Sequence, residues 1–202
     1  NTRDNDAKYV LGKLNFKQNK FKDVITYLED VEHGELKTEE ISNSKFYLAY
    51  AYFFTKKLDK ALPLFKSLSA SQNKYYYPAN YYAGFISMNN KDYSTAEKHF
   101  EKAAQASMYE NVIPYYLSQT YFAQKKYDAL LAYAPLQLVK QNLLYKNELQ
   151  NLVGQSYFMK KNYALALPFL ESNAKANKKM YPKDFYQLAF AQYQTQAFAD
   201  AV

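Results

Sequence analysis

The stretch 46-FYLAYAYFFTKKLDKALPLF-65 decides the fold, because its apolar residues recur at helical spacing on both sides of one polar break. Before the break, Phe46, Ala49, Tyr50 and Phe53 stand at i, i+3, i+4 and i+7. After the break TKK, positions 58, 61, 62 and 65 repeat that spacing. The pattern predicts two amphipathic helices of about a dozen residues, joined by a tight turn.

The same unit recurs along the whole chain. A large apolar marker follows each polar break, and the markers are 37, 35, 34, 36 and 35 residues apart. One hairpin cannot bury its apolar face alone, so we expect neighbouring hairpins to stack into a single solenoid over residues 1–202. We expect that the natural protein continues past Val202 or that this end frays, because the last unit stops early in its second helix. The markers are Phe21, Leu58, Tyr93, Tyr127, Tyr163 and Phe198, and the approximate repeats are 5–40, 42–75, 77–109, 111–145, 147–180 and 182–202 (truncated).

The composition agrees with an all-α fold. Only 4 glycines and 6 prolines occur in 202 residues, too few for the many special turns of an all-β protein. Small residues stand nine positions before each marker, where they would let two helix axes approach closely. Pro63 and Pro168 recur near the expected starts of second helices. The small column comprises Gly12, Ala49, Gly84, Ser118, Gly154 and Ala189.

The repeating unit resembles the tetratricopeptide repeat. Leu11-Gly12 matches the apolar–small pair of that family, and Ala61-x-x-x-Phe65 and Ala96-x-x-x-Phe100 match its second-helix signature. The aromatic that follows the pair is present as Tyr52, Tyr121 and Tyr157. The family's early tryptophan column is not kept, and Ala134 stands where the fourth unit should have an aromatic. The resemblance implies a right-handed superhelix; a related helical repeat of different pitch is the structural alternative.

The same resemblance implies that the first helices line a concave groove and bind proteins or peptides. First helices here carry extra aromatic columns on one face, a wider apolar arc than one packing contact requires. We expect these rings to form an apolar recognition surface; the competing interpretation is that they are buried between units. The candidate partner-binding residues are Phe46, Tyr50, Phe53, Phe54, Tyr81, Phe85, Tyr115 and Phe122.

Two functions follow as hypotheses. The first is a non-catalytic scaffold that binds a hydrophobic peptide or protein segment. The second is an envelope-associated factor whose tyrosine rings stack on sugars. The positions that grip a C-terminal carboxylate in some tetratricopeptide co-chaperones mostly carry Tyr, Phe or Gln here, which argues against that mode. The resemblance favours a bacterial periplasmic or envelope location over the cytoplasm, and the oligomeric state stays open.

The sequence offers no constellation for catalysis, and we expect no enzyme activity, cofactor or metal. The chain has no cysteine, and its two histidines, His33 and His99, occupy non-equivalent places without metal-ligand spacing. The net charge of +7 comes from lysines spread along the chain with one arginine, Arg3, so no nucleic-acid partner is expected. No apolar run is long enough for a membrane span.

Overall fold

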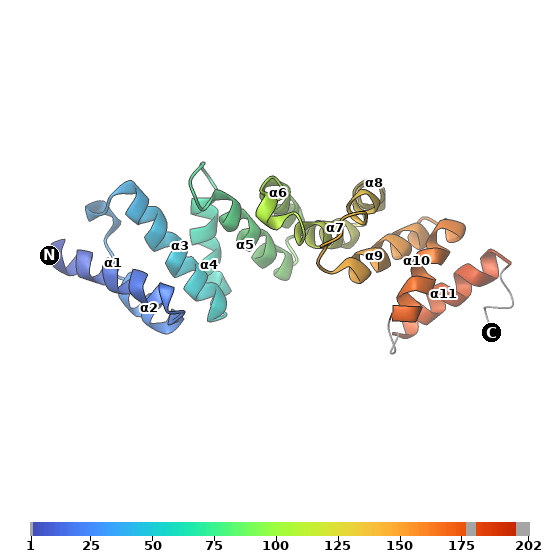
Figure 1. The fold of residues 1–202 in the computed structure, drawn as a ribbon, viewed down its shortest axis with the longest axis horizontal. Helices are drawn as coiled ribbons and strands as arrows, with labels where there is room; N and C mark the ends of the chain where they lie inside the picture. Colours follow the sequence, from blue (N-terminus) through green and yellow to red (C-terminus); the bar gives the residue numbers. More distant parts are fainter. Residues whose placement is uncertain (1, 177–180, 197–202) are drawn as a thin grey trace. The chain divides into compact units, whose positions relative to one another are not determined.

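The computed structural model describes residues 2–176 and 181–196, and within these residues the chain is entirely helical (Figure 1). Eleven α-helices and two short 3-10 turns account for the regular structure of the described residues, without a β-strand. The predicted all-α class is therefore confirmed. The chain divides into two compact units, residues 1–91 and 92–202, and we describe each unit by itself.

The first unit contains two helical hairpins and one further helix. The first hairpin is joined to the second by a linker that includes the 3-10 turn η1 (His33–Glu35). The second hairpin packs against both helices of the first, and α5 packs against α4. The helices are α1 (Thr2–Lys17), α2 (Phe21–Leu28), α3 (Thr38–Phe54), α4 (Leu58–Leu68) and α5 (Tyr76–Asn89).

The second unit opens with α6 and continues through two hairpins to α11. A 3-10 turn, η2 (Ser107–Tyr109), links α6 to α7. In this unit α7 packs against α6, α8 and α9, while α9, α10 and α11 pack together. The helices are α6 (Tyr93–Ala103), α7 (Ile113–Ala123), α8 (Tyr127–Gln137), α9 (Lys146–Met159), α10 (Tyr163–Ala176) and α11 (Pro182–Gln194).

The polar breaks form one recurring turn. Residue 56 has φ of 62°, in the left-handed region, and its N–H donates to the carbonyl of Phe53 (3.0 Å). The next N–H, of Lys57, donates to the carbonyl of Tyr52 (2.8 Å). These two bonds define the Schellman motif that ends a helix. The same left-handed residue stands two positions before every marker, at Asn19, Lys56, Lys91, Lys125, Lys161 and Gln196.

The small column has the packing role that the sequence predicts. A Cβ added to Gly12 would lie 2.4 Å from Cγ of Leu28, and one added to Gly154 would lie 2.7 Å from Cβ of Phe169. Ala49, in the same column, is fully buried. Small residues therefore let α1 approach α2 closely and α9 approach α10 closely.

The sequence predicts Pro63 and Pro168 near the starts of second helices, and the structure places them further along those helices. Pro63 lies inside α4 and Pro168 inside α10, each at the sixth helical position. Both prolines are exposed to solvent. Water can therefore solvate the carbonyl that loses its helical donor, which explains why these positions tolerate proline.

Carboxylates on second helices tie adjacent hairpins together. Glu29, at the end of α2, accepts hydrogen bonds from the Tyr52 hydroxyl (2.7 Å) and from Lys60 Nζ (2.6 Å). In the second unit, Glu97 of α6 accepts from Gln124 Nε2 (2.6 Å) and Lys126 Nζ (2.6 Å). Each carboxylate thus accepts hydrogen bonds from residues of the following hairpin.

Candidate functional site

A continuous cluster of aromatic rings occupies the first helices of the first unit. Tyr50 stacks on Phe54, with ring centroids 4.5 Å apart, and Phe54 stacks on Phe21 of α2 (5.1 Å). Phe53 meets Phe54 and Phe85 edge to face, both at 5.6 Å. Such edge-to-face and offset contacts are the preferred geometries of aromatic pairs. We call the set Tyr50, Phe53, Phe54, Tyr81 and Phe85 the aromatic surface.

The exposure of these rings differs from residue to residue. Phe54 is 49% exposed, and the other four members of the aromatic surface are partly buried. Phe46, which the sequence also suggests for partner binding, is only 8% exposed and stacks on Tyr75 at 4.2 Å. Phe46 therefore belongs to the core that supports the surface rather than to the surface itself.

The two remaining predicted residues, Tyr115 and Phe122, lie in the second unit. Tyr115 packs against Tyr116 (5.3 Å) and Tyr145 (4.8 Å). Phe122 packs against the marker ring that follows it, at 5.5 Å, and the ammonium of Lys183 lies 5.9 Å from its centroid. Both rings are partly buried.

A chain of hydrogen bonds, which we call the polar relay, links Tyr9, Asn43 and Tyr75 next to the aromatic cluster. The Tyr75 hydroxyl donates to Asn43 Oδ1 (2.8 Å), and Asn43 Nδ2 donates to the Tyr9 hydroxyl (3.0 Å). Tyr9 and Asn43 are 5% and 6% exposed. Burial is the main cause that raises the pKa of Tyr75. The relay crosses from α1 through α3 to the start of α5 and so fixes their relative positions.

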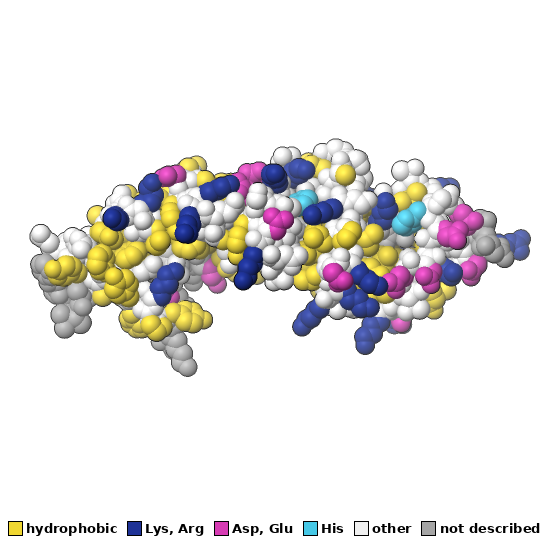
Figure 2. Space-filling view, turned by 180° about the vertical axis from the view of Figure 1, so that it is seen from behind, with side chains coloured by type: hydrophobic (Ala, Val, Ile, Leu, Met, Phe, Trp, Pro, Cys, Tyr) yellow, Lys and Arg dark blue, Asp and Glu magenta, His cyan; other side chains and the backbone are white. Residues whose placement is uncertain are grey.

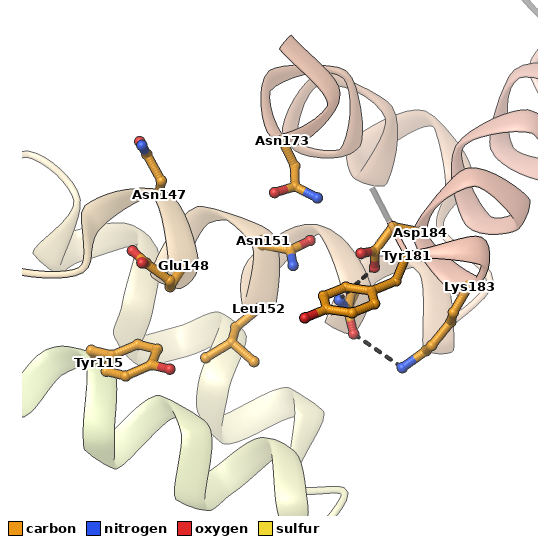
Figure 3. A pocket seen from close by; sticks show the side chains of 10 residues that line it. Tyr115, Asn147, Glu148, Asn151, Leu152, Asn173, Tyr181, Lys183 and Asp184 are labelled. Atoms are coloured by element: carbon orange, nitrogen blue, oxygen red, sulfur yellow. Dashed lines mark hydrogen bonds between the residues drawn. The ribbon is translucent and has the colours of Figure 1, made fainter. Parts of the chain in front are cut away.

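The second unit holds a pocket of about 500 Å³, which the sequence analysis did not identify (Figure 3). Its walls come from three first helices and one second helix. Tyr115 and Tyr181 lie on opposite sides of the pocket in Figure 3, with Asn151 and Leu152 between them. The described lining residues are Tyr115 of α7; Asn147, Glu148, Asn151, Leu152 and Gln155 of α9; Asn173 of α10; and Tyr181, Lys183 and Asp184 at the start of α11.

A short polar network closes one end of this pocket. Gln155 Nε2 donates to Asp184 Oδ1 (3.3 Å), and Lys183 Nζ donates to Gln155 Oε1 (3.3 Å), as Figure 3 shows. Gln155 and Asp184 are buried. By contrast, Oδ1 of Asn151 is buried but finds no hydrogen-bond donor among the described residues. An acceptor left in this way is costly unless a ligand or water satisfies it.

The pocket has a signal in the sequence. Asn151 lies twelve positions before its marker, in the column that holds Phe46, Tyr81 and Tyr115 in other repeats. Gln155 lies in the column of Tyr50, eight positions before the marker. An amide fills less space than a ring, so the fifth repeat leaves a hollow at Asn151, where every other repeat has an aromatic residue.

The described residues hold no assembled catalytic or metal centre. No group of three or more His, Cys, Asp or Glu side chains that could hold a metal occurs among them. Burial lowers the pKa of His33, with the nearby Lys45 charge as a second cause. No described helix is both long and apolar enough to cross a bilayer. On the face drawn in Figure 2, apolar side chains reach the surface in several patches, and lysines are scattered among them.

Comparison with known proteins identifies the fold class. The sequence matches no protein-family model and no curated protein, but solved structures of tetratricopeptide type match it over most of its length. A crystal structure of MamA from strain AMB-1 aligns with a TM-score of 0.72 at 15% identity, covering 89% of this chain and 94% of MamA. PilF of Pseudomonas aeruginosa aligns with a TM-score of 0.63 at 14% identity, covering 98% and 87%.

A third structure carries the repeat in its own description. It is the C-terminal part of a TPR repeat-containing protein from Cytophaga hutchinsonii, with a TM-score of 0.66, 17% identity and coverage of 94% and 72%. The predicted tetratricopeptide-like fold is therefore confirmed. At these identities, the likeness concerns the fold alone.

Proposed function

We propose that this chain is a non-catalytic scaffold that binds a protein or peptide segment through the aromatic surface of its first unit. The observation that supports this proposal is the continuous contact among partly exposed rings, from Phe21 through Phe54 and Phe53 to Phe85. Rings with one side packed and the other open are the anchors that dominate many protein interfaces.

Preorganisation supports the same proposal. The rings of Tyr50 and Phe53 are held by neighbours on several sides, so little side-chain entropy remains to be lost when a partner binds. A partner that places large apolar side chains over Phe54 would remove further apolar area from water. We expect an amphipathic helix or an extended segment with at least two such side chains.

The non-catalytic assignment rests on the chemistry present and on the fold. Tetratricopeptide-like neighbours favour an interaction role, and no described cluster of titratable residues has the geometry of a catalytic site. We also propose a bacterial envelope location, which cell fractionation with an antibody to the chain would test.

A second candidate function is glycan binding. Tyr50 and Tyr81 are partly exposed and combine a flat apolar ring with a hydroxyl, which suits the faces and hydroxyls of a sugar. This alternative uses the same surface with a different ligand, so one set of variants tests both.

The experiment selects ligands for the intact chain from a random-peptide display library and, in parallel, from an oligosaccharide array. The variants Phe54→Ser and Phe85→Ser remove rings of the aromatic surface, and Phe185→Ser removes a ring that is 58% exposed on α11 as the matched control. We expect peptides with two or more large apolar residues to lose at least about tenfold in affinity in the first two variants only.

Two results would contradict the proposal. If the selected peptides bind the Phe54→Ser and Phe85→Ser variants as well as the unmodified chain, the aromatic surface is not the site. If only oligosaccharides bind, and the same variants abolish that binding, the glycan function replaces the peptide function.

A further inference from the structure

The pocket of the second unit is rich in hydrogen-bond acceptors. Oδ1 of Asn151 is buried without a donor among the described residues. The Glu148 carboxylate is exposed at the mouth and forms no salt bridge with a described residue. Asp184 uses Oδ1 for Gln155, and a carboxylate has further lone pairs to offer. A ligand that satisfies these groups must be a donor at several points.

The cation in the lining is already engaged. Lys183 Nζ donates to Gln155 Oε1 and lies 5.9 Å from the ring of Phe122, so contacts of the protein itself hold this ammonium. Among the described lining residues, two carboxylates face this single cation. The described part of the lining is therefore acidic, with Glu148 and Asp184 against Lys183, in a chain whose net charge is +7. This contrast favours a cationic ligand over a carboxylate or a phosphate.

Aromatic walls add a second preference. The ring of Tyr115 is fixed by Tyr116 and Tyr145, and Tyr181 stands across the pocket from it (Figure 3). The Glu148 carboxylate lies near enough to contribute, after burial, to the raised pKa of Tyr115. A planar cation can stack on such a ring while its N–H groups reach the carboxylate. Guanidinium has this shape, whereas an ammonium acts as a point charge.

We propose that this pocket receives the guanidinium of an arginine side chain on a partner protein, with Glu148 and Asn151 as its acceptors and Tyr115 as its stacking platform. The proposal rests on the proposed scaffold function and supplies a specificity element for it. The aromatic surface binds apolar side chains of a partner, and the pocket selects a partner that also carries arginine.

The test is an NMR titration of the intact, isotope-labelled chain with the acetylated methylamide of arginine. The lysine, citrulline and glutamate analogues and N-acetylglucosamine serve as comparison ligands. We expect the arginine probe to shift the side-chain amide signals of Asn147 and Asn151 and to bind at least about tenfold more tightly than neutral citrulline, because charged hydrogen bonds are the stronger ones.

Two variants and one control locate the effect. Glu148→Gln keeps the shape but removes the charge, and it should weaken arginine binding about tenfold. Asn151→Tyr restores the aromatic of its column and should abolish binding by filling the hollow. Glu110→Gln, which removes an exposed carboxylate outside the pocket lining, should leave binding unchanged.

The outcomes separate this proposal from the one on which it rests. Arginine should bind the Phe54→Ser variant normally, and peptides without arginine should bind Glu148→Gln normally. Equal binding of citrulline or lysine, tighter binding of glutamate or N-acetylglucosamine, or no shift at Asn147 and Asn151 would each overturn the arginine assignment. None of these results would affect the peptide-binding test at the aromatic surface.

Discussion

Lys56 shows how much of this fold depends on single backbone conformations. Its φ of 62° ends α3 in a left-handed residue, a conformation that costs a non-glycine residue roughly 1 kcal/mol or more. The conformation recurs at six turns, and in the turns of Asn19, Lys56, Lys125 and Lys161 both Schellman bonds satisfy carbonyls at the end of the first helix. The side chain at this position is exposed and is not needed for the turn.

Replacing Lys56 by glycine should therefore stabilise the protein. Glycine adopts positive φ without strain, so we expect Lys56→Gly to change the free energy of unfolding by about 0 to +1 kcal/mol. Lys66→Gly is the control, since Lys66 is exposed inside α4, where glycine costs about 1 kcal/mol. Urea unfolding measures both values. A larger loss of stability in Lys56→Gly than in Lys66→Gly would contradict the assignment of strain.

Asn43 provides the second prediction at this scale. Its amide joins Tyr9 and Tyr75; Tyr9 and Asn43 are buried, and Tyr75 is partly buried. Asn43→Ala leaves two hydroxyls without their partner, so we expect a loss of about 1–3 kcal/mol in the free energy of unfolding. Gln72 is exposed, so the control Gln72→Ala should change the free energy of unfolding by less than about 0.5 kcal/mol. Equal effects in the two variants would show that the relay contributes nothing.

Between elements, close approach of helices is decided by the small column. Gly154 sits where α9 touches α10, and an added Cβ would lie 2.7 Å from Cβ of Phe169. That atom cannot rotate away, so Gly154→Ala must push the helices apart, and we expect a loss of about 1–3 kcal/mol. Gly34→Ala is the matched control, because its Cβ would meet nothing within 4 Å. Thermal unfolding of both variants checks the difference, and an unchanged Tm in Gly154→Ala would refute it.

The carboxylate of Glu29 links two hairpins and gives a pH-dependent prediction. Hydrogen bonds from Lys60 and then from Tyr52 lower the pKa of Glu29 below its ordinary value of 4.5. Its contribution to stability is therefore complete above that value and is lost as the pH falls through the folded pKa. Glu29→Gln should lower Tm by a few degrees at pH 7 and should narrow the gap between Tm at neutral and at acid pH.

Glu110→Gln is the control for Glu29→Gln, because the Glu110 carboxylate is exposed and forms no salt bridge with a described residue. Its Tm should follow that of the unmodified chain at every pH. If Glu29→Gln shows the same acid dependence as the unmodified chain, the bonds from Tyr52 and Lys60 do not contribute to stability.

The elements were predictable from sequence because their signals are local. Helical spacing and the polar breaks place every hairpin turn, and the small column predicts contacts such as that of Gly154. The positive φ of Lys56 could not be predicted from the sequence, because lysine has no preference for a left-handed conformation. Pro63 was misplaced because a proline on an exposed helix face loses little, which sequence position alone does not reveal.

On the scale of the whole chain, the regular repeat pattern made the fold predictable, but it gave no sign of the pocket in the second unit. The repeats share one pattern, so the tetratricopeptide-like class could be predicted although the three similar solved structures share only 14–17% identity with this chain. The pocket arises at Asn151, the one position of its column that lacks an aromatic residue, and a pattern of recurring aromatics gives no sign of it. Phe46 shows the opposite error, because an aromatic at helical spacing can be core.

The 23 tyrosines of the chain allow a last prediction about the molecule as a whole. Burial raises the pKa of Tyr121 and of Tyr133 to about 12, and it also raises that of Tyr52, where the bond to Glu29 is a second cause. In the unfolded chain these phenols titrate near 10, so unfolding releases protons above that pH. These phenols should therefore leave stability unchanged below about pH 10, and stability should fall as the pH rises from about 10 to 12.

Absorbance at 295 nm and circular dichroism at 222 nm, followed together against pH, test this prediction. Most tyrosines should ionise near pH 10 while the helical signal persists, and a later group should ionise only as the helices unfold.

In Tyr133→Phe, a phenol that resists ionisation is removed, so the late absorbance step should shrink and the fall in Tm with pH should become shallower. Because the unfolded chain releases protons first, denaturant should move the late step to lower pH, while a simple delay in ionisation of a folded chain would not respond to denaturant. Ionisation of all tyrosines in one step near pH 10 with an intact helical signal would contradict the burial of these rings.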